Sequence, residues 1–446
     1  MRWLLYNLCF GLVSLAVLPR MLVRMRRRGG YAAHFEQRFG RYHPALRARL
    51  GTGGPVWIHA VSVGEVYVAG QLMRALRALD PAMRFVLSTT SSTGWREAEK
   101  LLGEADTLIY NPLDFPWMVR RALDAVRPRA FLLVETELWP NWIRACAARG
   151  IPLALVNGRM SDQTAATYRL LRFWFGPVLR LFDLLLVQSA LDADRFTAAG
   201  ADRDRIVITG SFKFDVAQRQ PAREQRTAAL LRQLDLAGDR LILLGGSTWP
   251  GEERILLDIY RDLLPRHPGL RLALVPRHFE RREDVAAQIR VAGLRPVLKS
   301  SIDSSGGPPA PLTADDVLLV DTTGELMGFY PHAAIVFVGR SLATANGGQN
   351  MIEPCLCGVP TIVGPHTGNF RPVMADLLGS DAILQVADAA ALRVAVDRLL
   401  GDPDERRARG GRAARAVAAR RGVVAHCATR LLEQVISPPP TPGNAG

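Results

Sequence analysis

Short apolar runs alternate with amphipathic helical segments through most of this chain of 446 residues. The runs are rich in Val, Ile and Leu, as in Val56–Val61, Ala130–Val134 and Leu270–Val275. Buried runs of this kind, separated by helices, are typical of parallel βαβ units. The pattern therefore predicts an α/β fold whose sheets are covered by helices on both faces.

The alternation occurs in two series, and the chain is long enough for two domains that each have a core. We predict Rossmann-like domains at residues 29–212 and 224–403, a linker at 213–223, C-terminal helices at 404–436 and a disordered tail at 437–446. Ligands bind outside the carboxyl ends of the strands in such sheets, so we expect the site in a cleft between the two domains. The predicted strands are Val56–Val61, Arg84–Ser88, Thr107–Tyr110, Ala130–Val134, Pro152–Val156, Leu184–Val187, Ile206–Thr209, Leu241–Leu244, Leu270–Val275, Val317–Val320, Ala334–Val338, Pro360–Val363 and Ile383–Val386.

The N-terminus combines an uncharged stretch, Trp3–Pro19, with the arginine-rich stretch Arg20–Arg28. The apolar run is at the short end for a membrane span, no small-residue cleavage site follows it, and the arginines favour a cytoplasmic location. Residues 1–28 are therefore predicted to form a single anchor, or at least a helix lying deep in the membrane interface, with the body of the protein in the cytoplasm. A helix that packs on the protein itself is the alternative. The net charge of +14 suits an acidic membrane surface or an acidic substrate, and no nucleic-acid-binding motif is visible.

Polar residues follow the strands of the first series. In His59–Glu65, Gly64 permits a tight turn, and Glu65 lies in the first turn of a helix, where the dipole favours the ionised form that a general base requires. A carboxylate there is also a common stabilising choice. Thr90 belongs to a hydroxyl-rich turn that suits phosphate, sugar or helix capping. Glu137 lies beside an aromatic residue, as in sugar sites, and Arg159 offers a guanidinium for phosphate.

Glycine-containing turns follow the strands of the second series. Ser247 and Thr248 lie in one such turn, Arg277 ends the next strand, and Gly324 and Asn350 open two more helices. Free backbone N–H groups and the dipole at a helix N-terminus favour phosphate, and an arginine neutralises a leaving phosphate. No metal-ligand cluster and no CxxC pair is visible, so neither a metal nor another cofactor is predicted.

Several motifs together resemble the 3-deoxy-D-manno-octulosonic acid (Kdo) transferases of lipopolysaccharide synthesis. The motifs are HAVSVGE (His59–Glu65), ETELWPN (Glu135–Asn141), VNGRMSD (Val156–Asp162), KFD (Lys213–Asp215), PRHFER (Pro276–Arg281), GELMGFY (Gly324–Tyr330), GGQNMIEP (Gly347–Pro354) and GPHTGNF (Gly364–Phe370). Three positions depart from the family pattern: Gln349 replaces a histidine, Trp249-Pro250 replaces a histidine-containing turn, and Ser211-Phe212 replaces an asparagine-aliphatic pair.

The resemblance implies a GT-B type inverting glycosyltransferase that moves Kdo from CMP-Kdo to a lipid A precursor at the cytoplasmic face of the inner membrane, without a metal. It implies that Glu65 takes the proton from the acceptor. The implied CMP-binding residues are Pro276, Arg277, Gly324, Glu325, Leu326, Asn350, Met351, Ile352 and Glu353, with Glu353 on the ribose. Further donor or acceptor contacts are expected from Ser62, Gly64, Thr90, Glu137, Arg159, Lys213, Ser247 and Thr248.

Two alternatives remain at this point. One is an enzyme on the same fold with another nucleotide-sugar donor, such as an epimerase. The other is a membrane-anchored paralogue that binds nucleotide or lipid without turnover.

Overall fold

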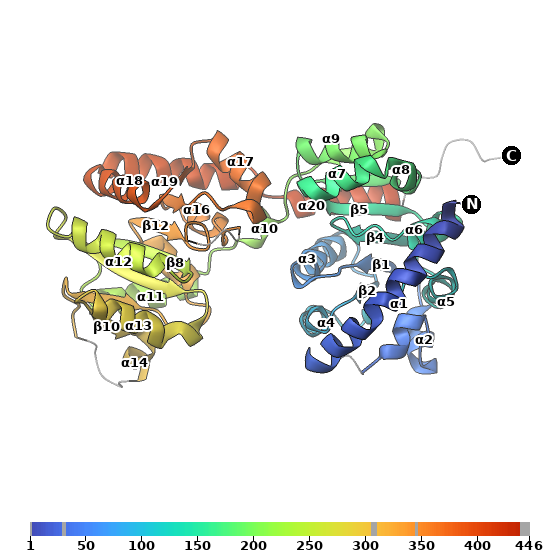
Figure 1. The fold of residues 1–446 in the computed structure, drawn as a ribbon, viewed down its shortest axis with the longest axis horizontal. Helices are drawn as coiled ribbons and strands as arrows, with labels where there is room; N and C mark the ends of the chain where they lie inside the picture. The colour runs from blue at the N-terminus through green and yellow to red at the C-terminus, as the bar shows by residue number, and fades with distance from the viewer. Residues whose placement is uncertain (1, 29–32, 305–309, 344–346, 438–446) are drawn as a thin grey trace. The chain divides into compact units, whose positions relative to one another are not determined.

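The computed structural model describes residues 2–28, 33–304, 310–343 and 347–437, with side chains of α1 (Arg2–Arg28) described as far as residue 17. Contacts divide the chain into two compact units. We call Met1–Phe212 with Gly422–Gly446 the N-terminal unit, and Lys213–Arg421 the C-terminal unit. Figure 1 shows that each unit is a sheet with helices on both faces. The α/β architecture predicted from the alternating pattern is confirmed.

The N-terminal unit contains a parallel sheet with the strand order β3-β2-β1-β4-β5-β6-β7. Consecutive residues of β1, Trp57 and Ile58, point into separate apolar clusters, because both faces of the sheet are covered. Its strands are β1 (Val56–His59), β2 (Phe85–Thr89), β3 (Thr107–Tyr110), β4 (Ala130–Val134), β5 (Leu153–Gly158), β6 (Leu184–Val187) and β7 (Ile206–Ile208). Besides α1, its helices are α2 (Pro44–Leu50), α3 (Val63–Leu79), α4 (Ser92–Glu99), α5 (Pro116–Val126), α6 (Pro140–Ala147), α7 (Asp162–Leu170), α8 (Arg172–Leu179), α9 (Ala190–Ala199) and α20 (Val423–Leu431).

The C-terminal unit contains a second parallel sheet, with the order β10-β11-β9-β8-β12-β13-β14. Leu243 and Leu244 on β8 again point into clusters on opposite faces. Its strands are β8 (Leu241–Thr248), β9 (Leu270–Pro276), β10 (Arg295–Leu298), β11 (Asp316–Leu319), β12 (Ile335–Val338), β13 (Thr361–Val363) and β14 (Ile383–Gln385). Its helices are α10 (Lys213–Val216), α11 (Pro221–Gln233), α12 (Glu252–Leu263), α13 (Arg282–Val291), α14 (Lys299–Ser304), α15 (Leu326–Phe329), α16 (Ile352–Leu356), α17 (Arg371–Gly379), α18 (Ala389–Gly401) and α19 (Pro403–Ala418).

Strand order reverses direction once in each sheet, next to the first strand of the unit. The reversal lies between β1 and β4 in the N-terminal unit and between β8 and β12 in the C-terminal unit. Loops leave such a point to opposite sides, which opens a crevice at the carboxyl ends of the strands. These two points are therefore where ligand-binding residues are expected in each unit.

Some elements differ from the sequence-based prediction. The edge strand β10 was not predicted, because its four residues include an arginine and a proline and remain partly exposed. The C-terminal helical segment is interrupted at Gly422, whose φ of 87° is left-handed. As a result α19 belongs to the C-terminal unit, while α20 packs against α3 in the N-terminal unit. Apart from Ser437, the predicted disordered tail lies outside the described residues.

The N-terminal helix α1 packs along its own unit. The Tyr6 hydroxyl donates to Asp114 Oδ2 at 2.8 Å, Asn141 Nδ2 donates to Asn7 Oδ1 at 2.7 Å, and the Phe10 ring lies 5.1 Å from that of Phe115. Within the described part of the chain, no helix has both the length and the apolarity to cross a membrane. The spanning anchor predicted for residues 1–28 is therefore not seen, and the packing is that of the alternative helix lying on the protein.

Candidate active site

Glu65 is held at the carboxyl end of β1 by a capping box. Ser62 ends the loop after β1, and its hydroxyl accepts the N–H of Glu65 at 3.3 Å. In return, Glu65 Oε1 accepts the N–H of Ser62 at 3.3 Å and Oε2 accepts that of Val61 at 2.9 Å. This exchange satisfies free N–H groups at the start of α3 and fixes the carboxylate in one orientation. Gly64 lies within α3 without left-handed backbone, so the tight turn predicted there is absent.

The pKa of Glu65 moves in the direction opposite to that expected from the helix dipole alone. The residue is 6% exposed, and burial raises its pKa to about 7. The hydrogen bonds from Val61 and Ser62 lower the pKa, but less than burial raises it, and the charges of Glu135 and Glu137 add to the increase. A carboxyl group that titrates near neutral pH can accept a proton and release it again, which suits a general base.

Two further carboxylates and an arginine follow the neighbouring strands β4 and β5. Glu135 has a left-handed φ of 60° and accepts a hydrogen bond from Arg159 Nε at 3.0 Å. Burial and the charge of Glu135 raise the pKa of Glu137. Asn157 also has left-handed backbone, with a φ of 55°. Backbone strain at two adjacent strand ends points to a functional edge of the sheet. The sequence-predicted residues Glu137 and Arg159 are thus brought to the edge that carries Glu65.

Thr90 lies at the end of β2, on the other side of β1. Its backbone carbonyl accepts from the buried Arg38 at 2.8 Å, and its hydroxyl lies 3.5 Å from the carbonyl oxygen of Val61. The turn is therefore tied to the Glu65 loop. The neighbouring Ser91 is the N-cap of α4, which confirms the capping role considered for this hydroxyl-rich stretch.

In the C-terminal unit, predicted residues gather where β8 and β9 end. Ser247 has a left-handed φ of 52°, and the carbonyl of Thr248 accepts the N–H of Arg277 at 3.1 Å. This bond places Arg277, which is exposed, directly after Pro276 at the carboxyl edge. An exposed guanidinium at this edge is available to an anionic ligand.

The predicted segment at Gly324–Leu326 lies beyond β11. Gly324 has a φ of 82°, and its carbonyl accepts a hydrogen bond from Arg223. Glu325 lies 3.8 Å from the ammonium group of the buried Lys299, which also contacts Asp303 at 2.7 Å. Because helix α15 begins only at Leu326 and spans four residues, Glu325 belongs to the turn before it.

The helix in the segment Asn350–Glu353 begins later than predicted. The expected helix began at Asn350, whereas α16 has five residues and begins at Ile352. Asn350 Oδ1 accepts the N–H of Ile352 at 3.1 Å, and its amide donates to Glu353 Oε1 at 2.9 Å. Burial raises the pKa of Glu353, while this hydrogen bond lowers it. The side chains of Met351 and Ile352 are fully buried, so only their backbone is available to a ligand.

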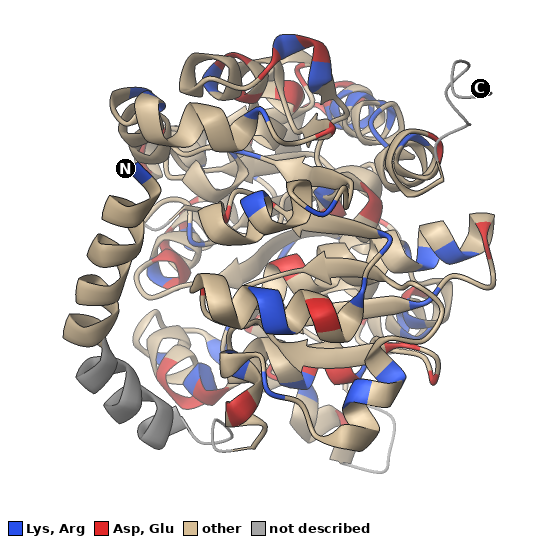
Figure 2. Cartoon of the chain, turned by 90° about the vertical axis from the view of Figure 1, so that its right-hand side faces the viewer, with Lys and Arg blue, Asp and Glu red and all other residues tan. Residues whose placement is uncertain are grey.

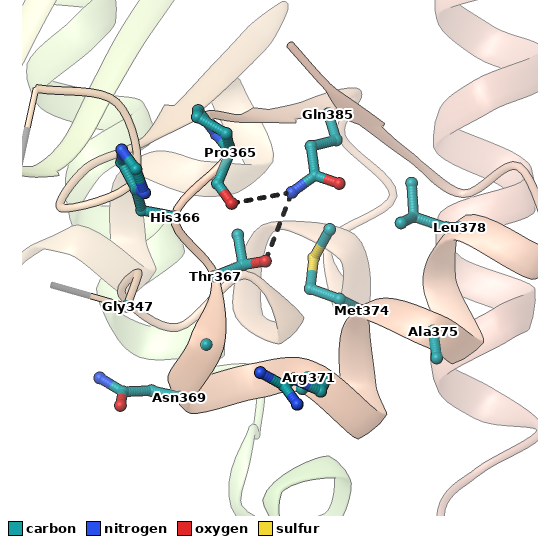
Figure 3. Close-up of a pocket in the computed structure, with 11 residues that line it drawn as sticks. Gly347, Pro365, His366, Thr367, Asn369, Arg371, Met374, Ala375, Leu378 and Gln385 are labelled. Atoms are coloured by element: carbon teal, nitrogen blue, oxygen red, sulfur yellow. Dashed lines mark hydrogen bonds between the residues drawn. The ribbon is translucent and has the colours of Figure 1, made fainter. Parts of the chain in front are cut away.

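A pocket of about 720 Å³ lies where β13 and β14 end, beside the glycine loop that precedes α16. Figure 3 shows Gln385 directed toward Pro365 and Thr367, and Arg371 at the start of α17. The pocket is mainly lined by the Gly364–Phe370 motif and the residues that follow it. Lys213 secures the motif from outside, because its ammonium group donates to the carbonyl of Asn369 at 2.7 Å and lies 4.1 Å from the Phe370 ring centre.

Sequence reasoning missed residues at the strand-order reversal of the C-terminal sheet. Arg340 follows β12 and lies over the ring of Trp249, with 4.8 Å between the guanidinium carbon and the ring centre. Glu252, at the start of α12, is fully buried. A single arginine or glutamate near a strand end is too common to stand out. The available signal was the departure from the family pattern at Trp249. No group of three or more His, Cys, Asp or Glu side chains suited to a metal occurs among the described residues.

Comparison with known proteins identifies the family. The family described as "3-Deoxy-D-manno-octulosonic-acid transferase (kdotransferase)" matches residues 33–216. A 3-deoxy-D-manno-octulosonic acid transferase of Bordetella pertussis is 38% identical over 401 residues, which are 86% of this chain and 88% of the relative. The transferase of Haemophilus influenzae is 32% identical over 82% of this chain and 86% of the relative. This chain belongs to the Kdo transferase family.

Solved structures resemble this chain in fold. The crystal structure of Anabaena Alr3699/HepE in complex with UDP has a TM-score of 0.56 and 13% identity, covering 85% of this chain and 99% of that chain. A putative UDP-N-acetylglucosamine 2-epimerase from Listeria monocytogenes has a TM-score of 0.54 at 13% identity, covering 85% and 96%. The similarity supports a GT-B-like fold with two α/β domains. The family membership identifies the protein as a glycosyltransferase.

Proposed function

We propose that this enzyme transfers Kdo from CMP-Kdo to a hydroxyl group of a lipid A precursor, with inversion at the anomeric carbon. The observation that carries the proposal is the buried carboxyl group of Glu65, which titrates near neutral pH at the strand-order reversal of the N-terminal sheet. Glu65 takes the proton of the acceptor hydroxyl while the hydroxyl oxygen of the acceptor bonds to the anomeric carbon of Kdo. The bond from that carbon to the phosphate oxygen breaks, and CMP leaves with the electron pair. One such displacement inverts the centre.

On the donor side, we propose that CMP is held at the carboxyl edge of the C-terminal sheet. Exposed Arg277 approaches the phosphate, while Glu353, oriented by Asn350, accepts from the ribose hydroxyls. The turn Gly324–Leu326 contributes backbone groups. The pocket of about 720 Å³ beside Arg371 is large enough for an eight-carbon sugar acid, and its arginine and amide groups suit a carboxylate and hydroxyls. No cofactor enters this scheme.

On the acceptor side, we propose that the strand ends around Glu65 receive a phosphorylated glucosamine unit. Glu137 accepts sugar hydroxyls, and Arg159 binds an acceptor phosphate in exchange for part of its contact with Glu135. The Arg159–Glu135 pair is partly exposed, so separating it costs little.

We also propose that α1 lies in the membrane surface of the cytoplasmic leaflet, with the catalytic body in the cytoplasm. Its protein-facing side carries Tyr6 and Phe10, whereas Leu4, Leu8 and Leu15 are 75%, 61% and 68% exposed. Residues 3–17 of α1, which Figure 2 draws in tan, include no charged side chain. A helix with one docked side and one exposed apolar side suits insertion parallel to the bilayer.

The turn between α7 and α8 extends this apolar surface. Leu170 is 84% exposed and Phe173 is 68% exposed, and α7 buries none of its residues. Arg2 lies 5.9 Å from the Phe173 ring centre, which joins this turn to α1. The exposed Arg169 and Arg172 beside the apolar residues suit anionic lipid headgroups.

The decisive test is transfer of Kdo from freshly made CMP-Kdo to a tetraacylated lipid A precursor, with the product sugars counted by mass spectrometry. A product with one or more added Kdo residues is expected. Cytidine nucleotides should raise the melting temperature of the enzyme more than uridine nucleotides do. Preference for uridine would indicate another donor. Cytidine binding without transfer would indicate a paralogue that binds without turnover.

A further inference from the structure

Arg340 occupies a strained position at the strand-order reversal of the C-terminal sheet. It follows β12 and has a φ of 59°, in the left-handed region that residues with a side chain rarely adopt. Strain of this kind persists only where the surrounding structure enforces it, and it concentrates at functional sites. The position is also where ligands bind in open parallel sheets, between β12 and β8.

A single buried carboxylate enforces this backbone. Glu252 is fully buried, and its two oxygens accept the backbone N–H groups of Trp249 at 2.9 Å, Arg340 at 2.8 Å, Ser341 at 2.9 Å and Leu342 at 3.0 Å. The carboxylate thus joins the loop after β8 to the loop after β12. It holds the backbone of Trp249 and Arg340 in fixed relative positions.

Three buried hydrogen-bonding atoms at the end of β8 and in these two loops have no partner among the described residues. They are Thr248 Oγ1, Trp249 Nε1 and Arg340 Nε. The Arg340 guanidinium also lies over the Trp249 ring at 4.8 Å, a cation–π arrangement that fixes the direction of the arginine. Each of the three groups carries a hydrogen to donate, so together they suit the oxygen atoms of an anion.

We propose that Arg340, Trp249 and Thr248 form a clamp for the phosphate group of the nucleotide donor. The proposal rests on the proposed function for the identity of the nucleotide. Arg277 lies next to the clamp, because its N–H bonds to the carbonyl of Thr248 at 3.1 Å, so two guanidinium groups share this edge. Helix α16 has only five residues and offers a weaker dipole than the sequence suggested. Arg340 therefore carries the phosphate charge that builds up when CMP leaves.

The clamp also accounts for Trp249, where the sequence departs from the family pattern. An indole supplies both the face on which a guanidinium stacks and a ring N–H. In this chain the Trp249 ring stacks with the Arg340 guanidinium, and the Trp249 ring N–H has no hydrogen-bond partner among the described residues. The tryptophan is therefore a functional partner of Arg340.

The test is calorimetric titration of the full-length protein with CMP, cytidine and free Kdo, comparing wild type with Arg340→Gly and Trp249→Phe. Arg340→Gly should weaken CMP binding about 10–100-fold, the loss of a charge-assisted hydrogen bond, and change cytidine binding less than threefold. Because glycine adopts this φ without strain, the same variant should melt about 2 °C higher. Trp249→Phe keeps the ring, removes the N–H and should weaken CMP binding several-fold.

Arg127→Gly is the matched control, since Arg127 has a φ of 47° at the end of α5 in the other unit. It should leave CMP binding unchanged. Unchanged CMP affinity in Arg340→Gly would overturn the clamp, as would an equal loss for CMP and cytidine. Loss of free Kdo binding with intact CMP binding would assign the clamp to the sugar carboxylate and overturn the phosphate assignment. If wild type itself fails to bind CMP, the proposed function fails as well, which is a distinct result.

Discussion

Replacing Glu65 by glutamine and by alanine helps to distinguish its capping role in the structure from its proposed role as the general base. As a cap, Glu65 accepts the N–H of Val61 at Oε2 and that of Ser62 at Oε1, and a glutamine side chain, with a single oxygen, keeps only one of these bonds. As a base, it needs an ionisable carboxyl group, which both replacements remove. Glu65→Gln therefore removes the base and keeps part of the cap, whereas Glu65→Ala removes the cap and the base together.

The expected loss of activity is large and equal in the two variants. A positioned general base contributes about 10²–10⁴-fold, so kcat/KM for Kdo transfer should fall by about that factor. Because the pKa of Glu65 is about 7, the wild-type rate should rise about tenfold per pH unit from pH 5 and level off above pH 7. The variants should lack this rise.

The expected effects on stability differ and depend on pH. The pKa of Glu65 is raised from 4.5 in an ordinary environment to about 7 in the folded protein. The difference of 7 − 4.5 = 2.5 is worth about 3 kcal/mol at about 1.4 kcal/mol per pKa unit. A raised carboxyl pKa contributes stability that is present below pH 4.5 and lost as pH rises through 7. Glu65→Gln has no such loss, so its melting temperature should rise relative to wild type between pH 5 and 8.

Glu65→Ala should melt below Glu65→Gln at every pH, because loss of the cap costs about 1 kcal/mol. That difference corresponds to about 2–4 °C in a unit of this size. The measurements are steady-state transfer by mass spectrometry and thermal unfolding from pH 5 to 8. Near-normal transfer by Glu65→Gln would refute the base assignment and leave Glu65 as a helix cap. A pH-independent difference in melting temperature between Glu65→Gln and wild type would refute the raised pKa.

Three other outcomes follow from the structure. Glu252→Gln places its amide NH2 group against two of the four backbone N–H groups, so it should lower stability by about 2–4 kcal/mol and weaken CMP binding. Thermal unfolding and calorimetry measure the two effects, and unchanged stability would contradict the bonding described. The double change Leu8→Ser with Leu12→Ser should reduce sedimentation of the protein with anionic vesicles. Val291→Ser changes another exposed apolar residue and should leave sedimentation unchanged. If the double variant binds vesicles as well as wild type does, α1 does not contact the membrane. Sedimentation of wild type should weaken at high salt, because exposed arginines meet lipid phosphates, and salt-independent binding would exclude that contribution.

Local sequence patterns predicted the strands well, because a buried parallel strand needs a continuous apolar run. β3, β4 and β6 have the predicted bounds, and most of the others differ by one or a few residues at their ends. The apolar pattern failed to predict elements whose structure depends on tertiary contacts. β10 is an exposed edge strand with little apolar character, and the helix expected from Asn350 is shortened because Asn350 turns its amide to Glu353. No local pattern distinguishes these outcomes.

Site residues could be predicted where they belong to a recognisable sequence motif. The sequence pointed to Glu65 and to the strand end that carries it, but the pKa direction expected from the helix dipole was wrong. Burial of the carboxyl group raises the pKa more than the hydrogen bonds from Val61 and Ser62 lower it, and the extent of burial depends on packing by distant segments. The N-terminal prediction shows the same limit. An uncharged stretch indicates an apolar helix, but the contact of Tyr6 with Asp114 that docks it is formed across 108 positions of sequence.

Backbone strain adds information that composition lacks. Eight non-glycine residues in the described chain have left-handed φ values, and they fall into two groups. His34, Arg127, Asp235 and Asp381 lie next to helix ends, where this conformation is common. Glu135, Asn157, Ser247 and Arg340 lie at or just after the carboxyl ends of β4, β5, β8 and β12. These four strands adjoin the strand-order reversals of the two sheets or form them, so the strained residues mark the same edges as Glu65 and Arg277. A glycine at any of the four positions would relieve the strain but would supply no carboxylate, amide, hydroxyl or guanidinium group to a ligand. Retention of a side chain there is what a site for sugars and phosphates requires.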